Sequence, residues 1–162
     1  MKIVNILPPI YRQITDRWPI NPDRTVFTYN HLLYDPGKNE IPDHLMVHEE
    51  HHAKQQDALA PIHTASCFCT KDLLEPCSCG ALQMGSDAWW KRFLEDPLFR
   101  IDQEAEAYAV QYNFYCRYKK DRNDQARFIS QIAGILSSGT YGNVIGHSDA
   151  IAMIKKYATK LR

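Results

Sequence analysis

The chain has 162 residues, of which 44% are hydrophobic and 23% are charged, and its formal net charge at neutral pH is zero. This length suits one domain with a sizeable core, and the balanced charge offers no electrostatic footprint for nucleic acid or for an anionic membrane. No run of about 18 apolar residues occurs, and the short apolar N-terminus lacks the pattern of a signal peptide. We therefore expect a cytoplasmic protein with no membrane or nucleic-acid partner.

The N-terminal part of the chain has the composition of a small β-sheet. Residues 2–7 predict a strand that ends at two prolines, and residues 10–18 predict a short helix. The segment 24–34 is rich in β-branched and aromatic residues, which favours a strand or a hairpin that closes at residues 35–38.

The stretch from Asp43 to Gln56 predicts a helix that carries the pattern His-Glu-x-x-His. Residues four apart lie on one face of a helix, so the imidazoles of His48 and His52 can reach one small cation. Imidazole nitrogen is a common zinc ligand, and a catalytic zinc site keeps one position for a water molecule. Glu49 lies on an adjoining part of that face, where it can take a proton from the water. The spacing therefore supplies two metal ligands and a general base.

Other interpretations of this histidine-rich helix remain open. A solvated helix with four histidines, namely His44, His48, His51 and His52, produces such a match by chance. The pair His44 and His48 also has helical spacing, but Leu45 follows its first histidine, so the pair lacks a base. His51 falls about 60° from the line that joins His48 and His52. We expect His44 and His51 to be polar surface or neighbours of the ligands.

A cysteine-rich insert is expected at about residues 63–84. Its cysteines are Cys67, Cys69, Cys77 and Cys79. Four cysteines this close together in a cytosolic chain indicate metal before disulfide, but Cys-x-Cys is less specific than Cys-x-x-Cys. A second, structural zinc ion, disulfides and free thiols all remain open. The fifth cysteine, Cys116, is expected to pack in a helix as a small hydrophobic residue.

Four further helices are expected after the insert. They are residues 86–95, 97–119, 121–137 and 148–161, the last two joined by a turn at 139–146. Asp96 followed by Pro97 predicts the start of the longest of them, because a capping residue precedes proline at the first helical position. Trp89 and Trp90 are expected to belong to the core.

A zinc site of this type needs a third protein ligand. In the helix 97–119 an apolar and aromatic stripe is formed by Ile101, Ala105, Tyr108, Tyr112 and Tyr115. Glu104 lies about 60° from the centre of the stripe, and Glu106 about 140°. A carboxylate directed into a core is costly unless it is paired or bound to metal. Glu104 is therefore the expected ligand, and Glu106 is expected to face solvent or to lie next to the ligands. The alternative is that Glu104 pairs with Arg100 or with a lysine at the edge of the stripe.

An ordered set of segments resembles the gluzincin branch of zinc metallopeptidases, and most closely the small metallopeptidases encoded by tailed bacteriophages. The likeness rests on His48-Glu-x-x-His52 followed by Glu104-x-x-Ala107, with further segments at 26–29, 41–56, 88–97, 99–108, 136–137 and 141–142. The cysteine-rich insert departs from that group. The resemblance implies His48, His52 and Glu104 as zinc ligands and Glu49 as general base. It also implies one small sheet beside a helical bundle.

These observations predict a single zincin-like domain over residues 1–162. Its fold class is α+β, mainly helical, with a short β-sheet near the N-terminus packed on the zinc-binding helix. The expected function is zinc-dependent hydrolysis of peptide bonds in a peptide or protein substrate, with a zinc-activated water and Glu49 as base. The expected compartment is the cytoplasm of a bacterium or of a phage-infected bacterial cell. The sequence indicates no oligomeric state.

Two details of the expected mechanism rest on weaker arguments. Tyr141 and His147, on the turn between the last helices, are candidate donors to an oxyanion. A substrate could lie as an extra strand along residues 25–31. The alternative function is a non-catalytic zinc-binding protein, in which the same three ligands clamp helices of a structural or regulatory phage component.

Overall fold

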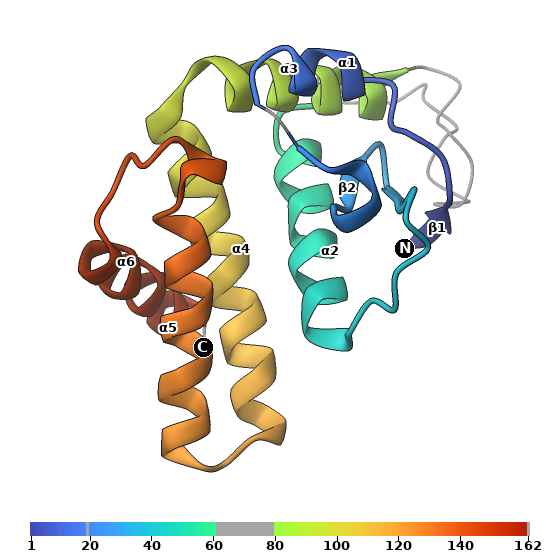
Figure 1. Ribbon diagram of the computed structural model, residues 1–162. Helices are drawn as coiled ribbons and strands as arrows, with labels where there is room; N and C mark the ends of the chain where they lie inside the picture. The colour runs from blue at the N-terminus through green and yellow to red at the C-terminus, as the bar shows by residue number, and fades with distance from the viewer. Residues whose placement is uncertain (19, 61–79, 162) are drawn as a thin grey trace, which may run out of the picture. The chain divides into compact units, whose positions relative to one another are not determined.

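The computed structural model describes residues 1–18, 20–60 and 80–161 (Figure 1). Most of the expected cysteine-rich insert at about 63–84 lies outside the described residues, together with Cys67, Cys69, Cys77 and Cys79. The second, structural zinc ion at those cysteines therefore stays a prediction.

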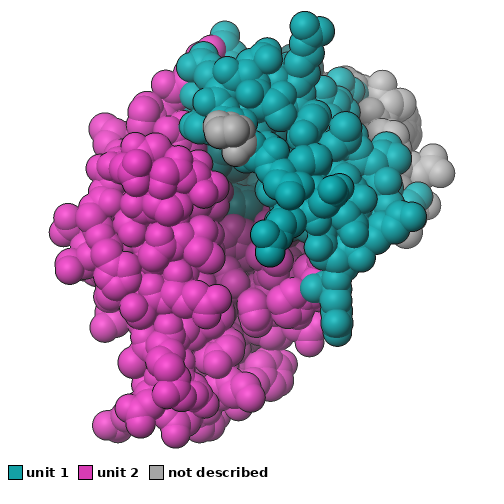
Figure 2. Space-filling model, viewed as in Figure 1, with its two compact units in different colours: residues 1–40, 52–94 teal, residues 41–51, 95–162 magenta. Residues whose placement is uncertain are grey.

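The described chain divides into two compact units, which Figure 2 shows in different colours. Unit 1 comprises residues 1–40 and 52–94, and unit 2 comprises residues 41–51 and 95–162. The division falls within the helix α2 (Asp43–Asp57), which is continuous from one end to the other. The N-terminal part of α2 therefore belongs to unit 2 and the C-terminal part to unit 1. The expectation of one domain over residues 1–162 stays a prediction.

Unit 1 contains a three-stranded sheet in the order β1-β3-β2. The strands are β1 (Lys2–Val4), β2 (Phe27–Tyr29) and β3 (Leu32–Tyr34), with β1 parallel and β2 antiparallel to β3. The hairpin of β2 and β3 turns at Asn30 and His31, whose φ angles are 48° and 60°. Two left-handed residues are what a two-residue type I′ turn requires, and asparagine tolerates that conformation.

The predicted closure of this hairpin at residues 35–38 is therefore wrong. Asp35 instead begins a separate turn, in which its buried carboxylate accepts hydrogen bonds from the backbone nitrogen and the side-chain amide of Asn39, at 2.6 and 2.7 Å. An aspartate that bonds nearby backbone in this way is a common turn former. Asp35 does begin a turn, but this turn follows β3 and does not join β2 to β3.

The helices of unit 1 cover the sheet through polar as well as apolar contacts. They are α1 (Tyr11–Thr15), the 3-10 turn η1 (Pro22–Arg24), α3 (Ala81–Glu95) and the C-terminal part of α2. The carbonyl of Thr28 in β2 accepts from Gln56 Nε2 of α2 at 2.8 Å and from Trp90 Nε1 of α3 at 2.9 Å. A Cβ added at Gly85 would lie 2.6 Å from the Gln56 carbonyl oxygen, so glycine permits the close approach of α3 to α2.

Unit 2 is a helical bundle with its own core. Its elements are the N-terminal part of α2, α4 (Pro97–Tyr118), α5 (Arg122–Leu136), the 3-10 turn η3 (Gly139–Tyr141) and α6 (His147–Lys160). α4 and α5 run side by side (Figure 1), and α6 packs on both. The buried core includes Ile101, Ala105, Ile132, Leu136 and Ile154. The predicted start of α4 is confirmed, because the Asp96 carboxylate accepts from the backbone nitrogens of Leu98 and Phe99, both at 3.0 Å.

The predicted fold class is confirmed: the described chain is mainly helical, with a small N-terminal sheet that contacts the C-terminal part of α2. α3 begins at Ala81, earlier than the predicted helix 86–95, and β1 ends at Val4 rather than at residue 7. Trp89 and Trp90 are buried, as predicted. Within the described ranges, no helix has the length and apolar character that a membrane crossing requires.

Candidate metal centre

The two histidines of the His-Glu-x-x-His pattern lie one turn apart on α2 and are both buried, with 3% and 5% of their surfaces exposed. With Glu104 of α4, which is 4% exposed, His48 and His52 form a group whose ligand atoms lie within 4.8 Å of one another. In the part of the chain that the structure describes, no other group of His, Cys, Asp or Glu meets this condition. Two imidazoles and a carboxylate at such separations could hold a metal ion.

The contact between His48 and Glu104 lies within unit 2 and joins α2 to α4. His48 Nε2 is 3.5 Å from Glu104 Oε2, and both side chains are almost fully buried. A carboxylate removed from water is stabilised only by a cation, by hydrogen bonds or by a metal. Glu104 is therefore buried, as its position beside the apolar stripe of α4 predicted, and could be a metal ligand.

His52 is oriented by a residue of its own helix. Its Nδ1 lies 2.8 Å from Oε1 of Gln55. An amide oxygen only accepts, so Nδ1 carries the proton and Nε2 keeps its lone pair for a cation. The Trp89 ring lies 5.3 Å from the His52 ring within unit 1. The sequence-based argument missed Gln55, although its spacing of three residues from His52 on a helix was a usable signal.

Glu49 is a further buried carboxylate, 7% exposed, and it is not a member of the ligand group. Its charge acts on Tyr108 within unit 2. The pKa of Tyr108 is raised first by burial and then by the charge of Glu104, and the charge of Glu49 raises it further. The Tyr108 ring in turn lies 4.5 Å from the His48 ring. Glu49 is therefore a buried carboxylate whose charge reaches Tyr108, and it lies outside the candidate ligand group.

Tyr141 of η3 reaches the ligand carboxylate directly. Its hydroxyl donates to Glu104 Oε2 at 2.9 Å and lies 3.4 Å from the Tyr108 hydroxyl. Burial, followed by the charge of Glu104, raises the pKa of Tyr141 well above its usual value, so the phenol keeps its proton. The predicted alternative partner of Glu104, Arg100, donates to the Tyr141 carbonyl at 3.4 Å. His147, the other candidate oxyanion donor, is exposed and bonds the Ser130 carbonyl at 3.0 Å.

The remaining histidines of α2 also have defined neighbours in unit 2. His51 Nε2 lies 3.3 Å from Glu106 Oε2, so the Glu106 carboxylate is next to His51 and outside the candidate ligand group. The Gln111 amide donates to His44 Nδ1 at 2.9 Å, and the His44 ring lies 5.1 Å from the Phe128 ring. Burial lowers the pKa of His44.

The outer edge of β2 is already occupied. Both lone pairs of the Thr28 carbonyl are engaged by Gln56 and Trp90, and the Asn30 N–H is shared by Gln56 Oε1 at 3.3 Å and Ser86 Oγ at 3.0 Å. A substrate that adds as a strand needs these backbone groups. The expected binding of substrate as an extra strand along residues 25–31 is therefore not supported at Thr28 and Asn30.

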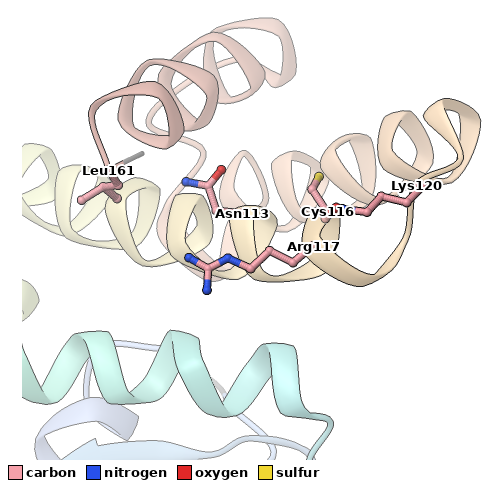
Figure 3. Close-up of a pocket in the computed structure, with 5 residues that line it drawn as sticks. All are labelled: Asn113, Cys116, Arg117, Lys120 and Leu161. Atoms are coloured by element: carbon pink, nitrogen blue, oxygen red, sulfur yellow. The ribbon is translucent and has the colours of Figure 1, made fainter.

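A cavity of about 290 Å³ lies apart from these residues, where α4 and α6 end (Figure 3). It is lined by Asn113, Cys116, Arg117, Lys120 and Leu161. The Asn113 amide donates to the Ala158 carbonyl at 2.9 Å, and Lys120 donates to the Cys116 carbonyl at 3.3 Å. Carbonyls in the last turn of a helix lack intrahelical partners. Asn113 and Lys120 therefore supply hydrogen-bond donors to the C-terminal ends of α6 and α4, respectively. None of the predicted site residues lines this cavity.

Comparison of the chain with protein-family models, with curated proteins and with solved structures finds no match. The resemblance to gluzincins and to the phage metallopeptidases therefore stays a prediction.

Proposed function

We propose that the chain is a zinc-dependent metallopeptidase, in which His48, His52 and Glu104 hold the metal and Glu49 is the general base. The observation that carries this proposal is the pairing of a buried three-ligand group with a buried carboxylate that is not part of it. A structural zinc site is closed by four protein ligands, whereas a catalytic site has three and keeps a position open. In a closed site there is no metal-bound water from which an adjacent acid could take a proton.

The donor set favours zinc over harder or softer ions. Two imidazoles with one carboxylate are a known catalytic zinc set, whereas magnesium and calcium prefer oxygen alone and copper(I) prefers sulfur. When bound, zinc would polarise the carbonyl group of the substrate and make a bound water acidic enough to lose its proton near neutral pH.

The chain's own residues supply the rest of the proposed reaction. Glu49 accepts the proton of the attacking water and passes it to the leaving amine nitrogen. Gln55 keeps the Nδ1 proton of His52 and so leaves Nε2 as the ligand atom. The peptide substrate is held by groups other than the backbone of Thr28 and Asn30, because side chains of α2 and α3 occupy that edge.

A second candidate is a non-catalytic metal-binding protein. The direct contact of His48 with Glu104 favours it, because an ion shared by α2 and α4 would stabilise the packing of unit 2. Glu49 distinguishes the two candidates, since a metal that only holds helices together gains nothing from an adjacent base.

The test is a pair of neighbouring substitutions on α2, Glu49→Gln and Glu50→Gln. Each removes one negative charge and keeps the shape, but only Glu49 is assigned a proton to carry. Zinc content and thermal stability are measured first and should match the wild type in both variants. Cleavage of an unfolded protein substrate should then fall by about 10²–10⁴-fold in Glu49→Gln and stay near wild type in Glu50→Gln.

Equal cleavage by Glu49→Gln and the wild type would contradict the peptidase mechanism. A wild-type protein that retains one zinc ion but cleaves nothing in a broad peptide library would favour the non-catalytic candidate.

A further inference from the structure

Tyr141 makes a contact that no local pattern in the sequence indicates. It lies 37 residues after Glu104, yet its hydroxyl donates to Glu104 Oε2 at 2.9 Å. That oxygen is also the one nearest His48 Nε2, at 3.5 Å. His48 of α2 and Tyr141 of η3, both in unit 2, therefore converge on one carboxylate oxygen of Glu104 in α4.

The turn that carries Tyr141 is held from several directions. The buried guanidinium of Arg100 donates to the Tyr141 carbonyl from Nε at 3.4 Å and from a terminal nitrogen at 3.5 Å. The Ser138 carbonyl accepts from the backbone nitrogens of Tyr141 and Asn143, both at 3.1 Å. Gly142 follows in the left-handed region, with φ of 89°, which glycine adopts without strain. The position of the phenol is thus determined by the backbone of the turn as well as by its own hydrogen bond.

The hydrogen bond to Glu104 limits what the phenol can do. A tyrosine hydroxyl has one proton, and here that proton is directed at the carboxylate. It cannot at the same time be donated to an oxyanion. An ionised carboxylate, by contrast, has about four acceptor positions, so one bond from Tyr141 leaves the others for a cation.

We propose that Tyr141 is a positioning residue for the metal, which fixes the carboxylate of Glu104 in the orientation that faces His48. The inference rests on the metal site of the proposed function, but not on peptidase activity. Partners that orient a ligand in this way contribute about 10–100-fold to metal affinity in other metalloproteins.

The experiment compares Tyr141→Phe with Tyr157→Phe. Tyr157 is a matched control, because its hydroxyl also donates to a carboxylate of α4, that of Asp102, but Asp102 is not in the ligand group. The zinc dissociation constant of each full-length protein is measured by competition with a chelator, and the melting temperature of each is measured without metal. We expect Tyr141→Phe to raise the dissociation constant by about 10–100-fold and Tyr157→Phe to leave it unchanged.

A second variant covers the case in which Tyr141→Phe does not fold. Gly142→Ala keeps every side chain of the site but strains the turn at φ of 89°, so it should displace the phenol and weaken zinc binding. Unchanged zinc affinity in Tyr141→Phe would overturn the positioning role of Tyr141, and so would an equal loss of zinc affinity in Tyr157→Phe. Neither result would contradict the proposed function. Absence of zinc binding by the wild type would instead overturn the proposed function.

Discussion

The choice of Glu104 over Glu106 as the third ligand can be tested by one matched pair of substitutions. Glu104→Gln keeps the size of the side chain and an oxygen that can accept from Tyr141, but it replaces a charged ligand by a neutral amide. Glu106→Gln makes the same change two residues further along α4, where the carboxylate pairs with His51 instead. We expect zinc affinity to fall in the first variant and to be retained in the second.

The size of the effect follows from the weaker metal binding that loss of a ligand causes. Loss of a ligand should cost at least as much as loss of an orienting partner, which is about 100-fold at its upper end. At free zinc a thousandfold above the wild-type dissociation constant, binding stabilises the folded protein by about 4.1 kcal/mol. A 100-fold weaker site gains only about 1.4 kcal/mol at the same zinc concentration. For a chain of this length, the difference removes about 5–11 °C from the zinc-induced rise in melting temperature.

The assay is thermal unfolding of each variant with and without zinc, with metal content measured after dialysis. Glu106→Gln should show the full zinc-induced rise, because Glu106 lies next to His51 and is not in the candidate ligand group. The reverse pattern, with zinc lost from Glu106→Gln and kept by Glu104→Gln, would refute the argument from the face of the helix. A zinc equivalent that persists in Glu104→Gln would point to Cys67, Cys69, Cys77 and Cys79.

Two further predictions concern stability. Gly85→Ala places a Cβ within 2.6 Å of the Gln56 carbonyl oxygen, so it should destabilise the protein by about 1–3 kcal/mol in urea unfolding, whereas Gly134→Ala, with open space around its Cβ, should not. Burial lowers the pKa of His44, so the unfolded chain binds that proton more readily than the folded one. Stability of the metal-free protein should therefore fall as pH drops below about 6.5, and less steeply in His44→Gln; equal slopes in the two proteins would exclude this origin.

Local patterns predicted those features that depend on neighbours along the chain. The spacing of His48 and His52 on a helix, and the side of α4 on which Glu104 lies, both follow from helical geometry. The contact of Tyr141 with Glu104 does not, because it depends on how α4, α5 and η3 pack in three dimensions.

The hairpin shows a different limit of sequence-based prediction. Asp35 with the proline and glycine after it is a strong turn signal in the sequence, whereas Asn30-His31 is a weak one. The pairing of Tyr29 with Leu32 determines where the hairpin turns, since it leaves only Asn30 and His31 between the strands. That pairing depends on burial of both strands, which becomes visible only in the folded unit.

The bonds to β2 have a consequence for association between molecules. An edge strand with free backbone groups is a template on which a second chain can pair, and this is a common route to aggregation. At Thr28 and Asn30 these backbone groups are not available to a second chain. The Thr28 carbonyl already accepts from Gln56 and Trp90, and the Asn30 N–H already donates to Gln56 and Ser86. Side chains from α2 and α3 thus protect this edge of a very short sheet as an additional strand would protect a longer one.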